Sequence, residues 1–186
     1  MSNTRLRFCF KVLAFTLLFF LSCGFQMSFW PNIITFLPSP QIWLIIIFFI
    51  SMKWKPVFTI FYIYFLAYCL TNFSEIPLKM LWTTLLITFT AIWFVKDRIQ
   101  LSGAFAFITI SLMGSMIFEV SYYFLSDLLE ITPTTFMFAD RLLQILINFI
   151  FSYPLYFALT SFDKALLDQD EWQKSSQPHQ EVSSHE

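Results

Sequence analysis

The chain has 186 residues, of which 58% are hydrophobic and only 12% are charged, and its formal net charge is −1. A soluble domain carries about 25% charged residues, so half of the usual polar surface is missing. This composition argues against a water-soluble domain and predicts one membrane domain built from apolar helices. The 26 phenylalanines suit helices that face lipid better than a compact core in water.

Charged residues and prolines divide the chain into about six predicted transmembrane helices. No charge occurs between Lys11 and Lys53, a stretch about twice as long as the roughly 20 residues that cross the hydrocarbon. Pro31, Pro38 and Pro40 interrupt it and predict a hairpin of two helices. The expected spans are residues 8–29, 40–52, 56–72, 77–95, 101–125 and 142–162.

These spans predict two parts, a transmembrane helical domain over residues 1–162 and a polar tail over residues 163–186. The first part of the tail could form a short helix beside the membrane, and we expect its end to be disordered. The predicted fold class is therefore all-α, a polytopic membrane helix bundle.

Basic residues give the predicted bundle an orientation. With six spans, nine of them fall on one side of the membrane, whereas Lys79 and Arg141 fall on the other. An excess of Lys and Arg marks the cytoplasmic side, so we expect both termini in the cytoplasm. The nine are Arg5, Arg7, Lys11, Lys53, Lys55, Lys96, Arg98, Lys164 and Lys174.

The first span leaves an alternative open. Its basic start, apolar run and Cys23 resemble a signal peptide with a lipoprotein cleavage site. Phe20 and Leu21 fit that cleavage pattern poorly, so we expect the segment to be retained; cleavage would leave five spans.

The residue inventory leaves little room for catalysis. The two histidines, His179 and His185, both lie in the polar tail, and the chain has three glycines. A buried His-based metal site, a Ser-His-Asp triad and a Gly-rich phosphate loop are thereby excluded. No basic stripe suggests nucleic-acid binding. We therefore expect no enzyme activity, no metal and no cofactor, and we expect lipids and proteins as partners.

Glu119 is the sharpest candidate for a functional residue. It lies 18 residues beyond Leu101, about 27 Å along a helix that rises 1.5 Å per residue, which puts it near the outer boundary of the membrane. It could bind or gate a cation, or it could pair with Lys79 or Arg141 near the outer ends of neighbouring spans, which we favour. Asn72 and Asn148 complete the candidate polar set, and for Asn148 we favour a hydrogen bond between helices.

The fifth predicted span also carries a surface of small residues. Such surfaces let helix backbones approach closely. We expect them to serve packing within the bundle, although a partner's helix could use the same surface. The candidate packing residues are Gly103, Ser111, Gly114 and Ser115.

Taken together, these features resemble the MreD family of rod shape-determining membrane proteins. The similarity covers about residues 35–165: Leu-Pro-Ser-Pro at 37–40, the aromatic third span ending at Asn72, Pro-Leu at 77–78, and the closing segment around Asn148. The family often has Gly and Asp near the end of its third helix and a Gly after the Pro-Leu; here Leu, Thr and Asn stand at 70–72, and Lys79 follows the Pro-Leu.

The resemblance implies a protein of the bacterial inner membrane that is not an enzyme. It implies a partner of MreC, acting as a scaffold in the machinery that guides lateral wall synthesis. It also implies a fold similar to the substrate-binding subunits of energy-coupling-factor vitamin transporters. That fold supplies the alternative function, a small-molecule binding subunit of a transporter, whose pocket Glu119, Lys79, Arg141, Asn72 and Asn148 could line.

Overall fold

The computed structural model describes residues 2–74, 76–96, 98, 103–130 and 137–175, with side chains from residue 8 to residue 166 within these ranges. All regular structure in the described residues is helical, which confirms the predicted all-α class. The elements are α1 (Ser2–Gly24), the π-helical turn η1 (Phe25–Phe29), α2 (Trp30–Ile33), α3 (Ile42–Lys53), α4 (Pro56–Thr71), α5 (Leu78–Lys96), α6 (Gly103–Leu129) and α7 (Phe138–Ser175).

Four helices are long and apolar enough to cross a membrane. They are the continuous run Phe8–Ile33, then Leu78–Lys96, Gly103–Leu129 and Phe138–Leu166. The other two, α3 and α4, have 12 and 16 residues, or about 18 and 24 Å at 1.5 Å per residue. The chain therefore has the architecture of a helical membrane bundle with four helices of spanning length.

Prolines and charges set most helix boundaries where the sequence predicts them. Pro56 is the first residue of α4, where its missing N–H costs little. Lys53 ends α3, and the following Trp54 is extended with φ −99° and ψ 163°. Gly103 has φ +66°, a left-handed conformation that favours glycine, at the start of α6.

The last helix is longer at both ends than its predicted span. It begins at Phe138, so Asp140 lies in its first turn, where a carboxylate is favourable at the positive end of a helix. It then continues to Ser175, so the predicted short helix of the tail is the extension of α7 itself. The predicted disorder of residues 176–186 lies outside the described residues.

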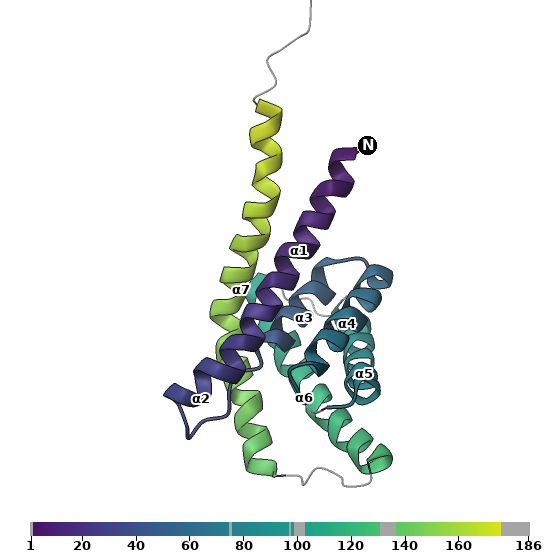
Figure 1. Cartoon of the computed structure of the whole chain (residues 1–186), viewed down its shortest axis with the longest axis vertical. Helices are drawn as coiled ribbons and strands as arrows, with labels where there is room; N and C mark the ends of the chain where they lie inside the picture. The colour runs from purple at the N-terminus through teal and green to yellow at the C-terminus, as the bar shows by residue number, and fades with distance from the viewer. Residues whose placement is uncertain (1, 75, 97, 99–102, 131–136, 176–186) are drawn as a thin grey trace, which may run out of the picture.

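After the continuous run of α1, η1 and α2, successive helices alternate in direction (Figure 1). Ring contacts between Phe15 and Phe162 and between Trp30 and Phe151 make the continuous run of α1, η1 and α2 antiparallel to α7. Those between Trp43 and Phe118 and between Phe49 and Phe107 do the same for α3 and α6. The start of α1, the α3–α4 turn and Asp163 of α7 therefore share one end of the bundle. We call it the basic end, and its counterpart the opposite end.

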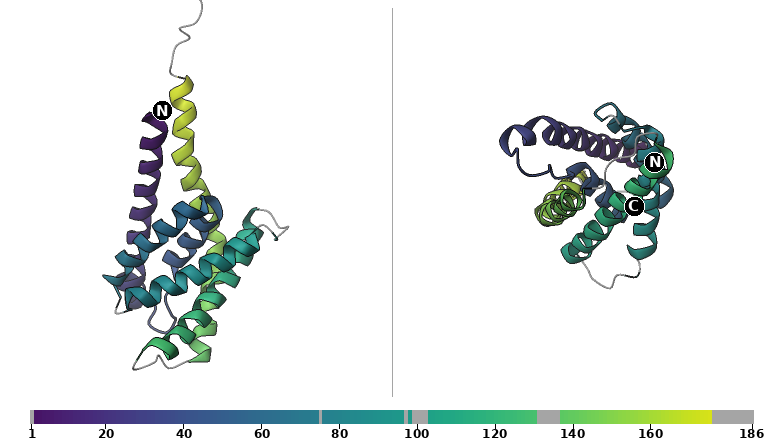
Figure 2. Two further views of the ribbon diagram at one scale, coloured as in Figure 1. Left: turned by 90° about the vertical axis from the view of Figure 1, so that its right-hand side faces the viewer. Right: turned by 90° about the horizontal axis from the view of Figure 1, so that it is seen from below.

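Helix α3 forms the centre of the bundle (Figures 1 and 2). Every residue from 43 to 51 is buried. A helix that is apolar all round is a buried helix rather than one that faces solvent on one side. α3 is therefore a short, buried helix that packs against α1, α5, α6 and α7.

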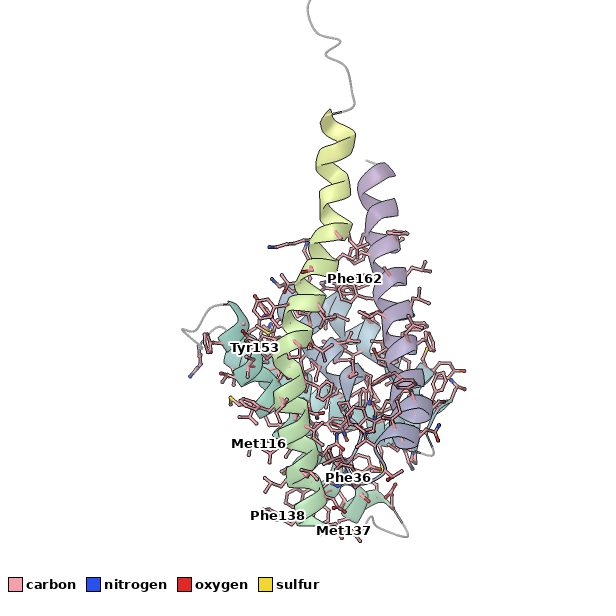
Figure 3. The ribbon with its side chains drawn as sticks, turned by 90° about the vertical axis from the view of Figure 1, so that its left-hand side faces the viewer. Phe36, Met116, Met137, Phe138, Tyr153 and Phe162 are labelled. Carbon is pink, nitrogen blue, oxygen red and sulfur yellow. The ribbon has the colours of Figure 1, made fainter. Side chains whose placement is uncertain are left out.

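The outer surface of the bundle is covered with apolar side chains (Figure 3). Met116 of α6 and Tyr153 of α7 are 50% and 55% exposed. A soluble monomer rarely exposes such large contiguous apolar surface, whereas lipid accommodates it. At the basic end, the start of α1 and the extension of α7 project beyond the other helices (Figures 1 and 2).

Candidate functional site

Polar side chains meet at the opposite end, between the start of α3 and facing surfaces of α6 and α7. On each of the two long helices they recur every three or four residues, so they share one face. We call the six side chains that bond across elements the polar seam: Gln41, Ser115, Glu119, Arg141, Gln144 and Asn148.

Glu119 is the acidic centre of the seam. It is only 3% exposed, and a buried carboxylate is stable only when it is paired and hydrogen-bonded. Arg141 Nη1 donates to Glu119 Oε2 at 2.9 Å, and Gln41 Nε2 donates to Oε1 at 3.1 Å. Both carboxylate oxygens of Glu119 therefore have donors from other segments of the chain.

Asn148 ties α7 to the start of α3 and to α6. Its Oδ1 accepts from the backbone N–H of Gln41 at 2.9 Å. Its Nδ2 donates to Gln41 Oε1 at 2.9 Å and to Ser115 Oγ at 3.3 Å. Asn148 is completely buried, so these bonds are what make its burial tolerable.

The segment before α3 explains why these side chains are needed. Pro38 and Pro40 lack N–H groups, and residues 38–41 belong to no regular element. No side chain caps the N-terminus of α3, so its first backbone groups require other partners. Gln144 Nε2 donates to the Ser39 carbonyl at 2.7 Å, and Asn148 accepts from the Gln41 N–H. Of these two side chains of α7, only Asn148 accepts from a backbone N–H as a cap would, whereas Gln144 holds the carbonyl of Ser39. The N–H groups of Ile42 and Leu44 donate to backbone carbonyls nearby.

The structure brings three of the five predicted polar residues together, namely Glu119, Arg141 and Asn148. It does not bring Lys79 or Asn72 to them. Lys79 is exposed in the first turn of α5. The exposed Asn72 donates to the Tyr68 and Cys69 carbonyls and finishes its own helix. Position near a span's outer end does not specify which side of the helix a side chain occupies, and these two lie on other sides.

Three of the four predicted packing residues face the interior of the bundle. Ser111 and Ser115 are completely buried. A Cβ added to Gly114 would lie 2.8 Å from Cζ of Phe48 in α3, so glycine permits this close approach. Gly103 was expected to pack in the same way, but it is exposed and serves the left-handed start of α6 instead.

Sequence reasoning missed Gln41 and Gln144. Gln41 fell in a segment interpreted as a span boundary, and Gln144 in an apolar run. A usable signal was present, because Arg141, Gln144 and Asn148 are spaced three and four residues apart and so share one face of an α-helix.

The ion pair of the seam joins a buried carboxylate to a partly exposed guanidinium. The Arg141 side chain is 36% exposed, whereas that of Glu119 is 3% exposed. In the described part of the chain, no group of three His, Cys, Asp or Glu residues could hold a metal ion. A cavity between α5 and α6 measures only about 10 Å³ and is lined by apolar residues such as Ile92 and Ile110.

The fold and the seam define a class of protein: a helical membrane bundle whose described part has four helices of membrane-spanning length, two of which, α6 and α7, are tied to the start of α3 by internal hydrogen bonds. Comparisons with models of known families, with curated proteins and with solved structures find no match. The geometry of the seam and the sequence pattern are therefore the basis on which a function is proposed.

Proposed function

We propose that the chain is a scaffold protein of the bacterial inner membrane that acts through contacts of its helices and loops with other proteins. It belongs, in this proposal, to the cell-elongation machinery that directs peptidoglycan synthesis along the cell wall, with an MreC-like membrane protein as its partner. It crosses the membrane six times, with both termini in the cytoplasm.

The observation that carries the proposal is that the seam's polar groups bond to one another. Both oxygens of Glu119 and both ends of the Asn148 amide have partners within the chain. A network of this kind stabilises one arrangement of helices. A scaffold needs a fixed surface rather than a site that opens and closes, and the seam supplies that fixity.

The six crossings are supported by the alternating directions of the helices and by charge. The basic end carries Lys53, Lys55 and Arg98, all exposed, whereas the opposite end carries exposed Asp127 and Asp140 beside exposed Lys79 and partly exposed Arg141. Positive charge beside membrane spans favours the cytoplasmic side. This asymmetry favours cytoplasmic termini, with the seam toward the outer face.

Depletion of the protein in a rod-shaped host, followed by microscopy, tests the proposal. We expect the cells to become round within a few generations and to recover when the gene is expressed again. A matched depletion of an unrelated multi-pass membrane protein controls for general membrane stress. Unchanged cell shape would count against the elongation role.

One observation favours the second candidate, a subunit that binds a small vitamin-like molecule. Arg141 is about one-third exposed beside the buried Glu119, so an anionic ligand could approach the guanidinium from outside. Thermal stabilisation of the purified protein by a vitamin, lost in Glu119→Gln, would favour this candidate over the scaffold. Under the scaffold proposal, Glu119→Gln changes stability or partner assembly, and no ligand raises the melting temperature.

A further inference from the structure

The α3–α4 turn presents two lysines on either side of a buried tryptophan. Lys53 and Lys55 are exposed, whereas Trp54 between them is only 8% exposed. Trp54 packs against Phe15 of α1 and Tyr62 of α4. The anchored indole therefore holds the turn in place. Lys55 is exposed beside it, and the exposed Lys53 has its ammonium 6.0 Å from the centroid of the Phe49 ring.

Two further lysines, Lys11 and Lys164, lie at the same end of the bundle. The Lys11 ammonium is 6.0 Å from the centroid of the Trp54 ring and forms an ion pair with Asp163 of α7. Lys164, the next residue of α7, is exposed. We call Lys53, Lys55 and Lys164 the basic rim.

The described residues leave the basic rim without a counter-charge. Asp163 is taken by Lys11, and none of the three rim lysines forms an ion pair with another described residue. The acidic stretch at 168–171 continues the α7 helix away from the bundle (Figure 1), so its backbone does not return over the α3–α4 turn. Within the described residues, the three rim lysines therefore have no acidic partner.

Anionic phospholipid fits this position better than a soluble ligand does. The rim lies where apolar stretches end: α3 ends at Lys53, and in α7 the uncharged stretch after Arg141 ends at Asp163 and Lys164. Headgroups lie just beyond the hydrocarbon, and lysines there are attracted to anionic lipid. Exposed Phe8 and Val57 nearby offer surface to the acyl chains.

We propose that the basic rim binds the phosphate headgroups of anionic phospholipids in the leaflet at this end of the molecule. The ammonium groups pair with the lipid phosphate, and Trp54 fixes the turn that presents two of them. The lipid fastens the α3–α4 turn to the membrane surface. This proposal goes beyond the scaffold role and does not depend on it.

Lipid binding by the full chain tests the proposal directly. The protein is purified in a neutral detergent, and phosphatidylglycerol and phosphatidylcholine are titrated separately while bound lipid is counted by native mass spectrometry. We expect phosphatidylglycerol to bind roughly fivefold tighter or more, and high salt to weaken that preference. The triple variant Lys53→Gln, Lys55→Gln, Lys164→Gln should lose it, and the matching triple Lys→Arg variant should keep it.

Lys79→Gln, at the other end of the bundle, is the matched control and should leave the preference unchanged. All four positions are exposed, so the variants should fold, which the melting temperature in detergent checks. Equal binding of the two lipids by the parent protein would overturn the proposal, and so would a preference that survives the triple Gln variant. Displacement of phosphatidylglycerol by an equimolar polyglutamate peptide would instead assign the rim to an acidic protein. Cell shape on depletion is a separate readout, so the two proposals can fail independently.

Discussion

The polar seam and the aromatic core at the basic end are both buried, but they hold the bundle together differently. In the core, Phe15, Phe49 and Trp54 meet ring to ring. In the seam, Glu119 accepts from Arg141, and Asn148 both accepts from and donates to Gln41. Ring contacts tolerate small shifts, whereas a hydrogen bond weakens steeply when its angle changes. The comparison suggests that the core supplies cohesion, and that the seam fixes the position of α3 against α6 and α7.

The largest expected effect comes from removing the cation of the seam. Arg141→Met leaves the Glu119 carboxylate buried with one donor, Gln41, because its bond to Arg141 is lost. Breaking a buried pair from one side costs about 3–5 kcal/mol, and we expect the lower figure because Arg141 is 36% exposed. The free energy of unfolding is measured by SDS titration in mixed micelles. A loss below about 1 kcal/mol would mean that water or lipid already satisfies Glu119.

The next largest effect lies where the two regions meet. Gly114→Ala places a methyl group 2.8 Å from the Phe48 ring, and overpacking of a buried contact costs about 1–3 kcal/mol. Gly24→Ala is the matched control, because no atom lies within 4 Å of its added Cβ and alanine favours a helix over glycine. Equal stability of the two variants would show that α3 and α6 can separate freely.

A smaller effect is expected when the polar amide of Asn148 is replaced by an apolar side chain. Asn148→Leu keeps the number and branching of the heavy side-chain atoms but leaves the Gln41 backbone N–H without its partner. We expect a loss of about 1–2 kcal/mol. Asn72→Leu is the control, since the Asn72 amide bonds only carbonyls of its own helix and is exposed. If Asn72→Leu destabilises the protein as much as Asn148→Leu does, the buried amide of the seam contributes no more to stability than an exposed amide.

The smallest effect is expected in the apolar core. Ile46→Leu in α3 changes the shape of a fully buried side chain without changing its volume or polarity. Such exchanges cost less than about 1.5 kcal/mol. Unfolding of this variant in the same SDS titration gives the comparison with Asn148→Leu. A greater loss here than at Asn148 would reverse the roles given to the two regions.

The sequence predicted the helices better than their contacts, and the reason is physical. Charges and prolines mark helix ends locally, so Lys53 and Pro56 could be interpreted without knowing the fold. Spacing of three and four residues defines a face, so Ser111 and Ser115 were expected to pack. Neither rule says which helix a face meets.

The contacts within the candidate site could not be predicted from these sequence patterns. Pairing of Glu119 with Arg141 was one of two options, and only the packing of α6 against α7 selects it over Lys79. Gln41 acquires its role from Asn148, which is 107 residues away in the chain. The start of α3 also had to be placed before Gln41 could be recognised. Contacts of this range depend on the whole fold.

A double-mutant cycle on Glu119 and Arg141 tests most directly whether the seam is a structural clasp. The unfolding free energies of the parent chain, Glu119→Gln, Arg141→Met and the double variant give the coupling between the two side chains. We predict that the double variant is more stable than Arg141→Met alone, with a favourable coupling of about 1 kcal/mol or more. Additive losses, with no coupling, would contradict the account.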